Sequence, residues 1–240
     1  MAEKQPSPLP HGLEATDIAE SNTIRLISTA YIDEPAMAPL VDDDDDLGFL
    51  AEIERKTSLR QNEDLPLPPD VDRRELLTDA SGYGWSLINA AFCYTRPAGN
   101  RFNDEKRGAW YAAWGEHAAD TAIAEVSFHL ARELGNVGVF ENTTDYRELV
   151  ASFIGPFADL RDTTGEAWLD PDPAVGHLAG QLLAKELRAA GANGVVYPSL
   201  RYAGGFCLAA FRTNLIQNVR QGSTWRLTWD GDLTPAIAKV

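Results

Sequence analysis

The chain has 240 residues and a mass of 26.2 kDa, which allows one sizeable domain or two small ones, and 44% of its residues are hydrophobic, enough for a buried core. It carries 36 Asp and Glu against 21 Lys and Arg, a formal net charge of -15, and such an acidic surface repels nucleic-acid phosphates. No run approaches the roughly 18 consecutive apolar residues of a membrane helix, and no apolar signal core is found at the start. We therefore expect a cytoplasmic protein that binds neither nucleic acid nor a membrane.

The first stretch of the chain is expected to be flexible. Residues 1–22 lack hydrophobic periodicity and contain several prolines. The folded part is therefore predicted as a single domain over residues 23–240. It opens at residues 23–28, where apolar and polar residues alternate as in a half-buried strand, with Arg25 pointing away from the face of Ile24.

An acidic insertion is predicted around residues 37–80. Its run of aspartates, residues 42–46, favours the start of a solvated helix, because carboxylates are stabilised by the free N–H groups there. Residues 61–72 are rich in proline and are expected to form an irregular surface excursion. The composition changes at Ser81, and the apolar run after Trp85 through Phe92 fits either a helix or a strand.

Strands and helices alternate irregularly in the rest of the chain. Strands are predicted at residues 109–114, 137–140, 149–154, 157–160, 194–197, 206–211 and 225–229, and helices at residues 120–134 and 173–190. This order lacks the repeated βαβ spacing of a parallel sheet, so the predicted fold class is α+β, a mixed central sheet with flanking helices. In the first helix the apolar stripe predicted to face the core is Ile123, Val126, Leu130 and Leu134. Glu125 lies one step off this stripe, where its carboxylate would be only partly solvated.

Metal and disulfide chemistry have little support. The two cysteines, Cys93 and Cys207, both have apolar neighbours, so we expect two buried reduced thiols. The four histidines show no ligand spacing, so no metal site is predicted. The glycine-rich loops of nucleotide-binding proteins and the Gly-x-Ser-x-Gly elbow of hydrolases are also absent.

The candidate functional residues are dispersed along the chain. They lie at strand edges, turns or helix flanks, where side chains can converge on a cleft, and they are Arg25, Arg101, Tyr111, Glu125 and Ser199. Each also has an ordinary alternative. An arginine in a turn is usually a surface charge, a tyrosine on a strand usually belongs to the core, and a serine after a proline usually forms a turn.

Several separated strings resemble the RES-domain family. The sequence Arg-Phe-Asn-Asp at residues 101–104, followed by Trp-Tyr-Ala-Ala at 110–113 and Thr-Ala-Ile-Ala-Glu at 121–125, is similar to the family's central block. Residues 194–212 resemble its serine block over their whole length, and Arg25 stands in the place of its leading arginine. The resemblance implies an ADP-ribosyltransferase-like α+β core.

RES-domain proteins are typically NAD+-consuming toxins of bacterial toxin–antitoxin pairs. The resemblance implies that Arg25 and Arg101 bind the phosphates of NAD+ and that Tyr111 lines the nicotinamide side. It implies that Glu125 is the catalytic carboxylate, with Arg25 and Ser199 completing the catalytic pocket. It further implies NAD+ as the substrate without a metal cofactor, and an Xre-type antitoxin as the protein partner.

The chemistry suits these residue types. The nicotinamide ring of NAD+ is cationic and leaves as a neutral molecule, so it needs no strong acid. Cleavage of its bond to ribose mainly needs stabilisation of an oxocarbenium-like ribose, which one carboxylate can supply. Guanidinium forks match phosphate oxygens bidentately. Three functions stay open: hydrolysis or phosphorolysis of NAD+, transfer of ADP-ribose to a protein, and a catalytically inactive binding partner. The intact set of five candidate residues argues against the last.

Overall fold

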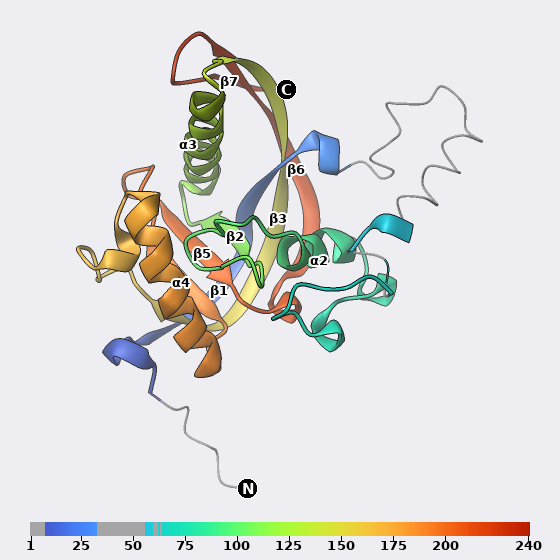
Figure 1. Cartoon of the computed structure of the whole chain (residues 1–240), viewed down its shortest axis with the longest axis vertical. Coiled ribbons are helices and arrows are strands. Elements are labelled where there is room, and N and C mark those ends of the chain that lie inside the picture. Colours follow the sequence, from blue (N-terminus) through green and yellow to red (C-terminus); the bar gives the residue numbers. More distant parts are fainter. Residues whose placement is uncertain (1–7, 33–55, 60–61, 63) are drawn as a thin grey trace, which may run out of the picture.

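The structure, a computed structural model, describes residues 8–32, 56–59, 62 and 64–240 (Figure 1). The strands are β1 (Ala15–Ser28), β2 (Trp110–Trp114), β3 (Glu141–Asp159), β4 (Gly194–Pro198), β5 (Phe206–Ala210), β6 (Gln217–Asp230) and β7 (Ala236–Lys239). The α-helices are α2 (Trp85–Cys93), α3 (Ala118–Val137) and α4 (Pro173–Ala189). Short 3-10 helices occur at Pro10–Gly12, Thr29–Tyr31, Arg73–Glu75, Asp79–Ser81, Ala167–Leu169 and Thr213–Leu215. None of the described helices is long and apolar enough to cross a membrane.

The strands form one mixed sheet in the order β1-β2-β5-β4-β3-β6-β7. Strands β3 and β4 pair in parallel and the other neighbours pair antiparallel. Strand β1 also pairs with β3, so the strands from β1 to β3 in this order form a closed circuit. The predicted α+β class with a mixed sheet and flanking helices is confirmed.

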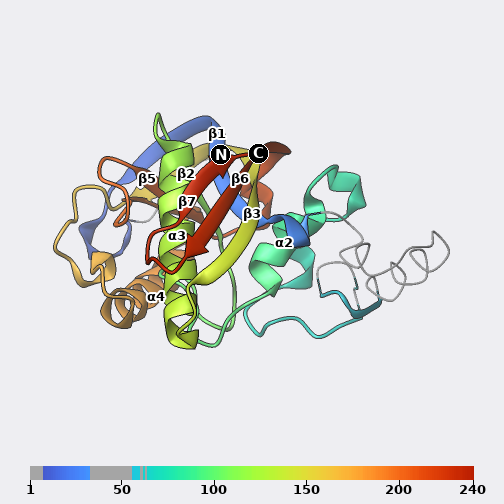
Figure 2. The same ribbon diagram turned by 90° about the horizontal axis from the view of Figure 1, so that it is seen from above.

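The helices cover the two faces of this circuit because successive residues of a strand point to opposite sides. In β2, Trp110 and Ala112 belong to the apolar cluster that includes α2. Tyr111 packs on the cluster that includes α4, and Ala113 packs with residues of α3. Helices α3 and α4 therefore lie on one side of β2 and α2 on the other (Figure 1 and Figure 2).

Local sequence signals set the helix ends. Helix α3 stops at Gly138, which adopts φ 75° and donates its N–H to the carbonyl of Leu134 at 2.8 Å, a conformation that favours glycine. Helix α4 opens with Pro173, and the carboxylate of Asp172 accepts a hydrogen bond of 2.9 Å from the N–H of Ala174. These signals thus define where α3 ends and where α4 begins.

The sequence predictions were wrong near residues 15–22 and 137–160, and the last predicted strand, residues 225–229, is only part of β6, with β7 following it unpredicted. Strand β1 begins at Ala15, so residues 15–22 are not flexible: their backbone pairs with β3, for example Ile18 with Gly155. Of the three short strands predicted over residues 137–160, the first falls on the end of α3 at Val137 and on the turn and irregular backbone of residues 138–140, and the other two belong to the single long strand β3. The Gly155-Pro156 pair, a turn signal in isolation, lies within β3, where the pairing with β1 continues unbroken.

The acidic insertion is described in part. The predicted helix start at residues 42–46 lies outside the described residues. Within residues 64–72 the chain forms turns and irregular backbone, as predicted, and the apolar stretch that follows is the helix α2.

Candidate functional site

A cavity of about 870 Å³ opens between β1, β2, α2, α3 and α4. Its volume lies within the roughly 300–1,000 Å³ typical of small-molecule and cofactor sites. Four of the five predicted site residues line it: Arg25, Arg101, Tyr111 and Glu125. The fold therefore brings together side chains that are separated by up to a hundred residues of sequence.

Arg25 reaches the cavity because β1 separates from β2 at this point. The two strands pair only at Ile24 and Ala113, which leaves the Tyr111 carbonyl on that edge free for the Arg25 side chain. Arg25 Nη1 donates to this carbonyl at 3.3 Å, and the guanidinium lies 5.0 Å from the ring centroid of Trp110. Burial lowers the pKa of Arg25 to about 10, so the side chain remains cationic at neutral pH.

Tyr111 and Arg101 are tied into the wall of the cavity. The Tyr111 hydroxyl accepts from the N–H of Phe102 at 2.8 Å and donates to Asn103 Oδ1 at 2.9 Å, which fixes the turn before β2. Arg101, 8% exposed, donates through Nη1 to the carbonyls of Trp168 and Asp170, each at 2.9 Å. Burial raises the pKa of Tyr111 above its usual range, so the phenol stays neutral.

Glu125 is oriented by Ser199. The Ser199 hydroxyl donates to Glu125 Oε1 at 2.6 Å. Ser199 does not itself line the cavity, although the Cys207 thiol beside it does, at 4.0 Å from the same carboxylate oxygen. Cys93 and Cys207 are both buried and free, as predicted, and burial raises the pKa of each thiol.

The sequence analysis missed several polar residues of the cavity. Those that line it include Arg96, Asn103, His129, Glu133, Tyr146, His177 and Arg201. Burial lowers the pKa of His129 and of His177 to about 4, and cationic neighbours that include Arg132 and Arg201 add to the effect. Both imidazoles are therefore neutral near pH 7.

A signal for part of this set was present in the sequence. Glu125, His129 and Glu133 are spaced by four residues, which places them on one face of α3. Val126 and Leu130 belong to the stripe that was predicted to face the core. In the structure they line the cavity next to Glu125, His129 and Glu133. The position of His177 on α4 could not be inferred in this way, because no local spacing relates it to the other residues.

The described residues contain no group of three or more His, Cys, Asp or Glu side chains that could hold a metal ion. The charged groups that line the cavity are instead four arginines, Arg25, Arg96, Arg101 and Arg201, and two glutamates, Glu125 and Glu133. The net charge of these six side chains is positive, opposite in sign to the net charge of -15 of the whole chain.

Comparison with known proteins places the chain in a family. No curated protein sequence matches it. A solved structure of the MbcT–MbcA toxin–antitoxin complex from M. tuberculosis is similar over 55% of this chain and 74% of that chain, with 20% sequence identity and a TM-score of 0.38. The sequence pattern of the RES domain matches residues 76–230, which is more than half of the chain and includes Arg101, Tyr111, Glu125 and Ser199. The chain therefore belongs to the RES-domain family.

Proposed function

We propose that this protein is a cytoplasmic toxin that consumes NAD+ by cleaving the bond between nicotinamide and ribose. The observation that carries the proposal is Glu125, a carboxylate that lines an 870 Å³ cavity and is held by the Ser199 hydroxyl at 2.6 Å. Membership of the RES-domain family supports the toxin role.

The charges of the cavity suit a dinucleotide diphosphate. Four arginines line the cavity against two glutamates, and one of these glutamates, Glu133, pairs with Arg96 at 3.4 Å. The remaining positive charge of Arg25, Arg101 and Arg201 favours an anionic ligand in an otherwise acidic protein. Arginine is suited to this task because its planar fork donates two parallel hydrogen bonds to phosphate oxygens.

The proposed reaction uses the protein, NAD+ and an attacking water or phosphate. The carbon–nitrogen bond breaks with its electron pair going to nicotinamide, which leaves as a neutral molecule, and positive charge develops on the ribose. The Glu125 carboxylate would stabilise this charge, because a fixed anion acts strongly in a site with little water. A water or phosphate oxygen then bonds to the ribose carbon, and the proton of the attacking group passes to solvent.

The assay follows free nicotinamide and the form of ADP-ribose released, with and without phosphate. Free ADP-ribose indicates hydrolysis, its 1-phosphate indicates phosphorolysis, and ADP-ribose attached to a protein supports the alternative transferase activity. Glu125→Gln should lower NAD+ consumption by about 100-fold or more. Glu116→Gln, an exposed glutamate outside the cavity, serves as the matched control and should retain full activity.

We also propose that an Xre-type antitoxin neutralises the protein. A chain with net charge -15 is a poor ligand for DNA but suits a basic partner, because complementary charge speeds encounter. A segment of the antitoxin would enter the cavity near Arg25 and Glu125. Co-expression with the protein of the neighbouring gene, followed by pull-down and the NAD+ assay on the complex, tests this, and full activity in a stoichiometric complex would reject it.

A further inference from the structure

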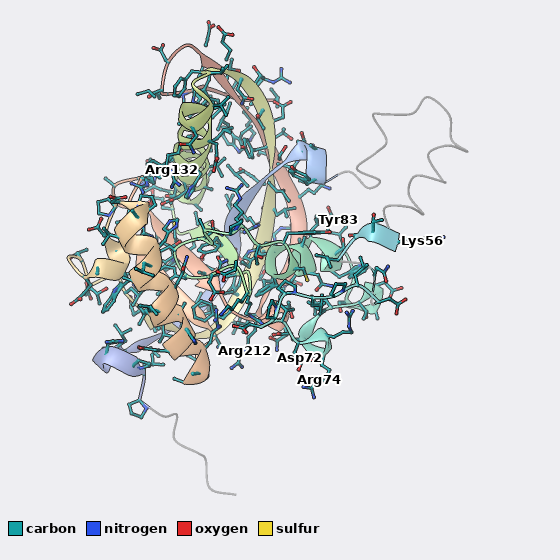
Figure 3. The ribbon with its side chains drawn as sticks, viewed as in Figure 1. Lys56, Asp72, Arg74, Tyr83, Arg132 and Arg212 are labelled. Carbon is teal, nitrogen blue, oxygen red and sulfur yellow. The ribbon has the colours of Figure 1, made fainter. Side chains whose placement is uncertain are left out.

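A second cavity of about 250 Å³ lies apart from the one that contains Glu125. Its lining residues are Asp70, Glu75, Arg107, Arg188, Ala192, Phe211 and Arg212, and none of them lines the larger cavity. In Figure 3, Arg212 is labelled in the lower half of the molecule, whereas Arg132, a residue of α3, is labelled in the upper half. Three arginines in so small a space are unusual for a chain with an excess of carboxylates.

Arg107 forms the fixed wall of this second cavity. It is 6% exposed and donates to both carboxylate oxygens of Glu75. Its terminal nitrogens also donate to the carbonyls of Asp70 at 2.9 Å and Phe211 at 2.7 Å, while its Nε is buried with no partner among the described residues. The charges of Arg107 and Glu75 cancel, so the pair leaves the other two arginines to determine the sign of the cavity.

Arg188 is a partly buried cation without a hydrogen bond or ion pair to any described residue. Burial lowers its pKa, and the neighbouring Arg107 lowers it further, while Asp104 and Asp70 act in the opposite sense without contacting it. A guanidinium taken out of water is costly unless an anion or several acceptors replace its hydration.

Arg212 is exposed and uses one nitrogen to donate to the carbonyl of Gly191 at 3.1 Å. A guanidinium has five N–H donors, so most donors of Arg212 and all of those of Arg188 remain available for a ligand in the cavity. Asp70 is the remaining carboxylate on the lining, and one carboxylate leaves the two arginines with a net positive charge.

We propose that this second cavity binds a phosphate group, with Arg188 and Arg212 as its ligands. Two guanidinium forks complement a tetrahedral dianion, and 250 Å³ has room for a phosphate group but not for a dinucleotide. The phosphate can come from inorganic phosphate or from a phosphomonoester. Bound there, it stabilises the contact between α4 and the segments before β2 and after β5, which carry these residues.

Thermal unfolding tests the proposal with inorganic phosphate and, in a separate arm, with glycerol 2-phosphate, each against sodium chloride of equal ionic strength. At about ten times Kd the midpoint should rise by about 3 to 6 °C. The compound with the larger rise identifies the source of the phosphate. The rise should vanish in Arg188→Gln/Arg212→Gln and persist in Arg220→Gln/Arg226→Gln, which removes two exposed arginines elsewhere.

Two further variants keep the result interpretable. Arg25→Gln alters the larger cavity and should retain the rise, so phosphate bound there is distinguished from phosphate at the second cavity. Arg212→Gln alone changes an exposed side chain, keeps the fold, and should weaken phosphate binding by about tenfold. The proposal is overturned by an equal rise in the double variant, by a rise lost only in Arg25→Gln, or by no rise with either compound.

Discussion

The Ser199 hydroxyl donates its single proton to Glu125 Oε1 over 2.6 Å, while the N–H groups of Arg201 and Tyr202 donate to the same hydroxyl oxygen at 3.2 and 3.1 Å. A hydroxyl has one proton and two lone pairs, so this serine uses its full hydrogen-bonding capacity. The loop that follows β4 thereby fixes the orientation of a carboxylate on α3. Ser199 is a positioning residue in this arrangement, because it contacts Glu125 and does not line the cavity.

We expect Ser199→Ala to lower kcat of NAD+ cleavage by about 10- to 100-fold, since a hydrogen bond to a charged group is worth about 1.5 to 3 kcal/mol. KM should change little, because Ser199 does not line the cavity. Ser199→Thr keeps the hydroxyl and should recover part of the rate. Steady-state kinetics of the three proteins measure this, and a raised KM with unchanged kcat would contradict it.

Arg25→Lys keeps the charge but loses the planar fork and the contact with the Tyr111 carbonyl and the Trp110 ring. We expect KM for NAD+ to rise by about tenfold with a smaller change in kcat. Arg220→Lys, an exposed arginine outside the cavity, is the control. If the two variants show the same KM, Arg25 does not bind the diphosphate.

Two glycines in helices give opposite expectations. A Cβ at Gly180 of α4 would lie 2.3 Å from the carbonyl oxygen of Arg101, whereas a Cβ at Gly135 of α3 would meet only the Phe140 ring at 3.6 Å. Gly135→Ala should therefore stabilise the protein by up to about 1 kcal/mol through helix propensity. Gly180→Ala should destabilise it by about 1 to 3 kcal/mol, because Arg101 must move. Denaturant unfolding compares the two, and stabilisation by Gly180→Ala would show that α4 and the Arg101 turn are not in close contact.

Stability should fall on mild acidification because of two cavity histidines. His129 and His177 have pKa values of about 4 in the folded protein, below the value near 6.5 of an unfolded chain. As pH falls from about 6.5 towards 4, the unfolded state binds more protons and the free energy of unfolding decreases. We expect a loss of about 1 kcal/mol per histidine, allowing for their partial exposure.

The measurement is urea unfolding at pH 7.0, 6.0 and 5.0, a range chosen above the usual pKa values of most carboxyls. The double variant His129→Asn/His177→Asn should lose less stability over this range than the parent. His117→Asn, an exposed histidine before α3, should behave like the parent. Parallel curves for all three proteins would contradict the assignment.

Much of the fold followed from local sequence patterns. Helices α3 and α4 and strands β2, β4 and β5 lie close to their predicted positions, because capping residues and alternation of apolar residues act over a few positions. The long strand β3 did not follow, since the Gly155-Pro156 pair reads as a turn. Pairing with β1, more than a hundred residues earlier, keeps this segment extended, and no local pattern reports such pairing.

The site was predicted by resemblance rather than by spacing. Four of the five candidates line one cavity, and the fifth, Ser199, reaches it through Glu125. The hydrogen bonds from Arg101 to the carbonyls of Trp168 and Asp170 could not be predicted from the sequence, because they join segments that are distant along the chain. The same holds for His177, whose helix is placed over the cavity only by the packing of α4 on the sheet.

The pairing of β1 with β3 has a consequence for synthesis of the protein. Thr23 on β1 donates its side-chain hydroxyl to the carbonyl of Ala151, 128 positions later, so β1 leaves the ribosome long before its partner exists. At about 5 to 20 residues per second the delay is roughly 6 to 25 s, during which the edge of β1 is unpaired and open to aggregation. Arg25 and Glu125 are both translated before β5, which supplies Cys207 to the same cavity. A nascent chain that ends before β5 therefore lacks a complete cavity, whatever the state of its earlier elements.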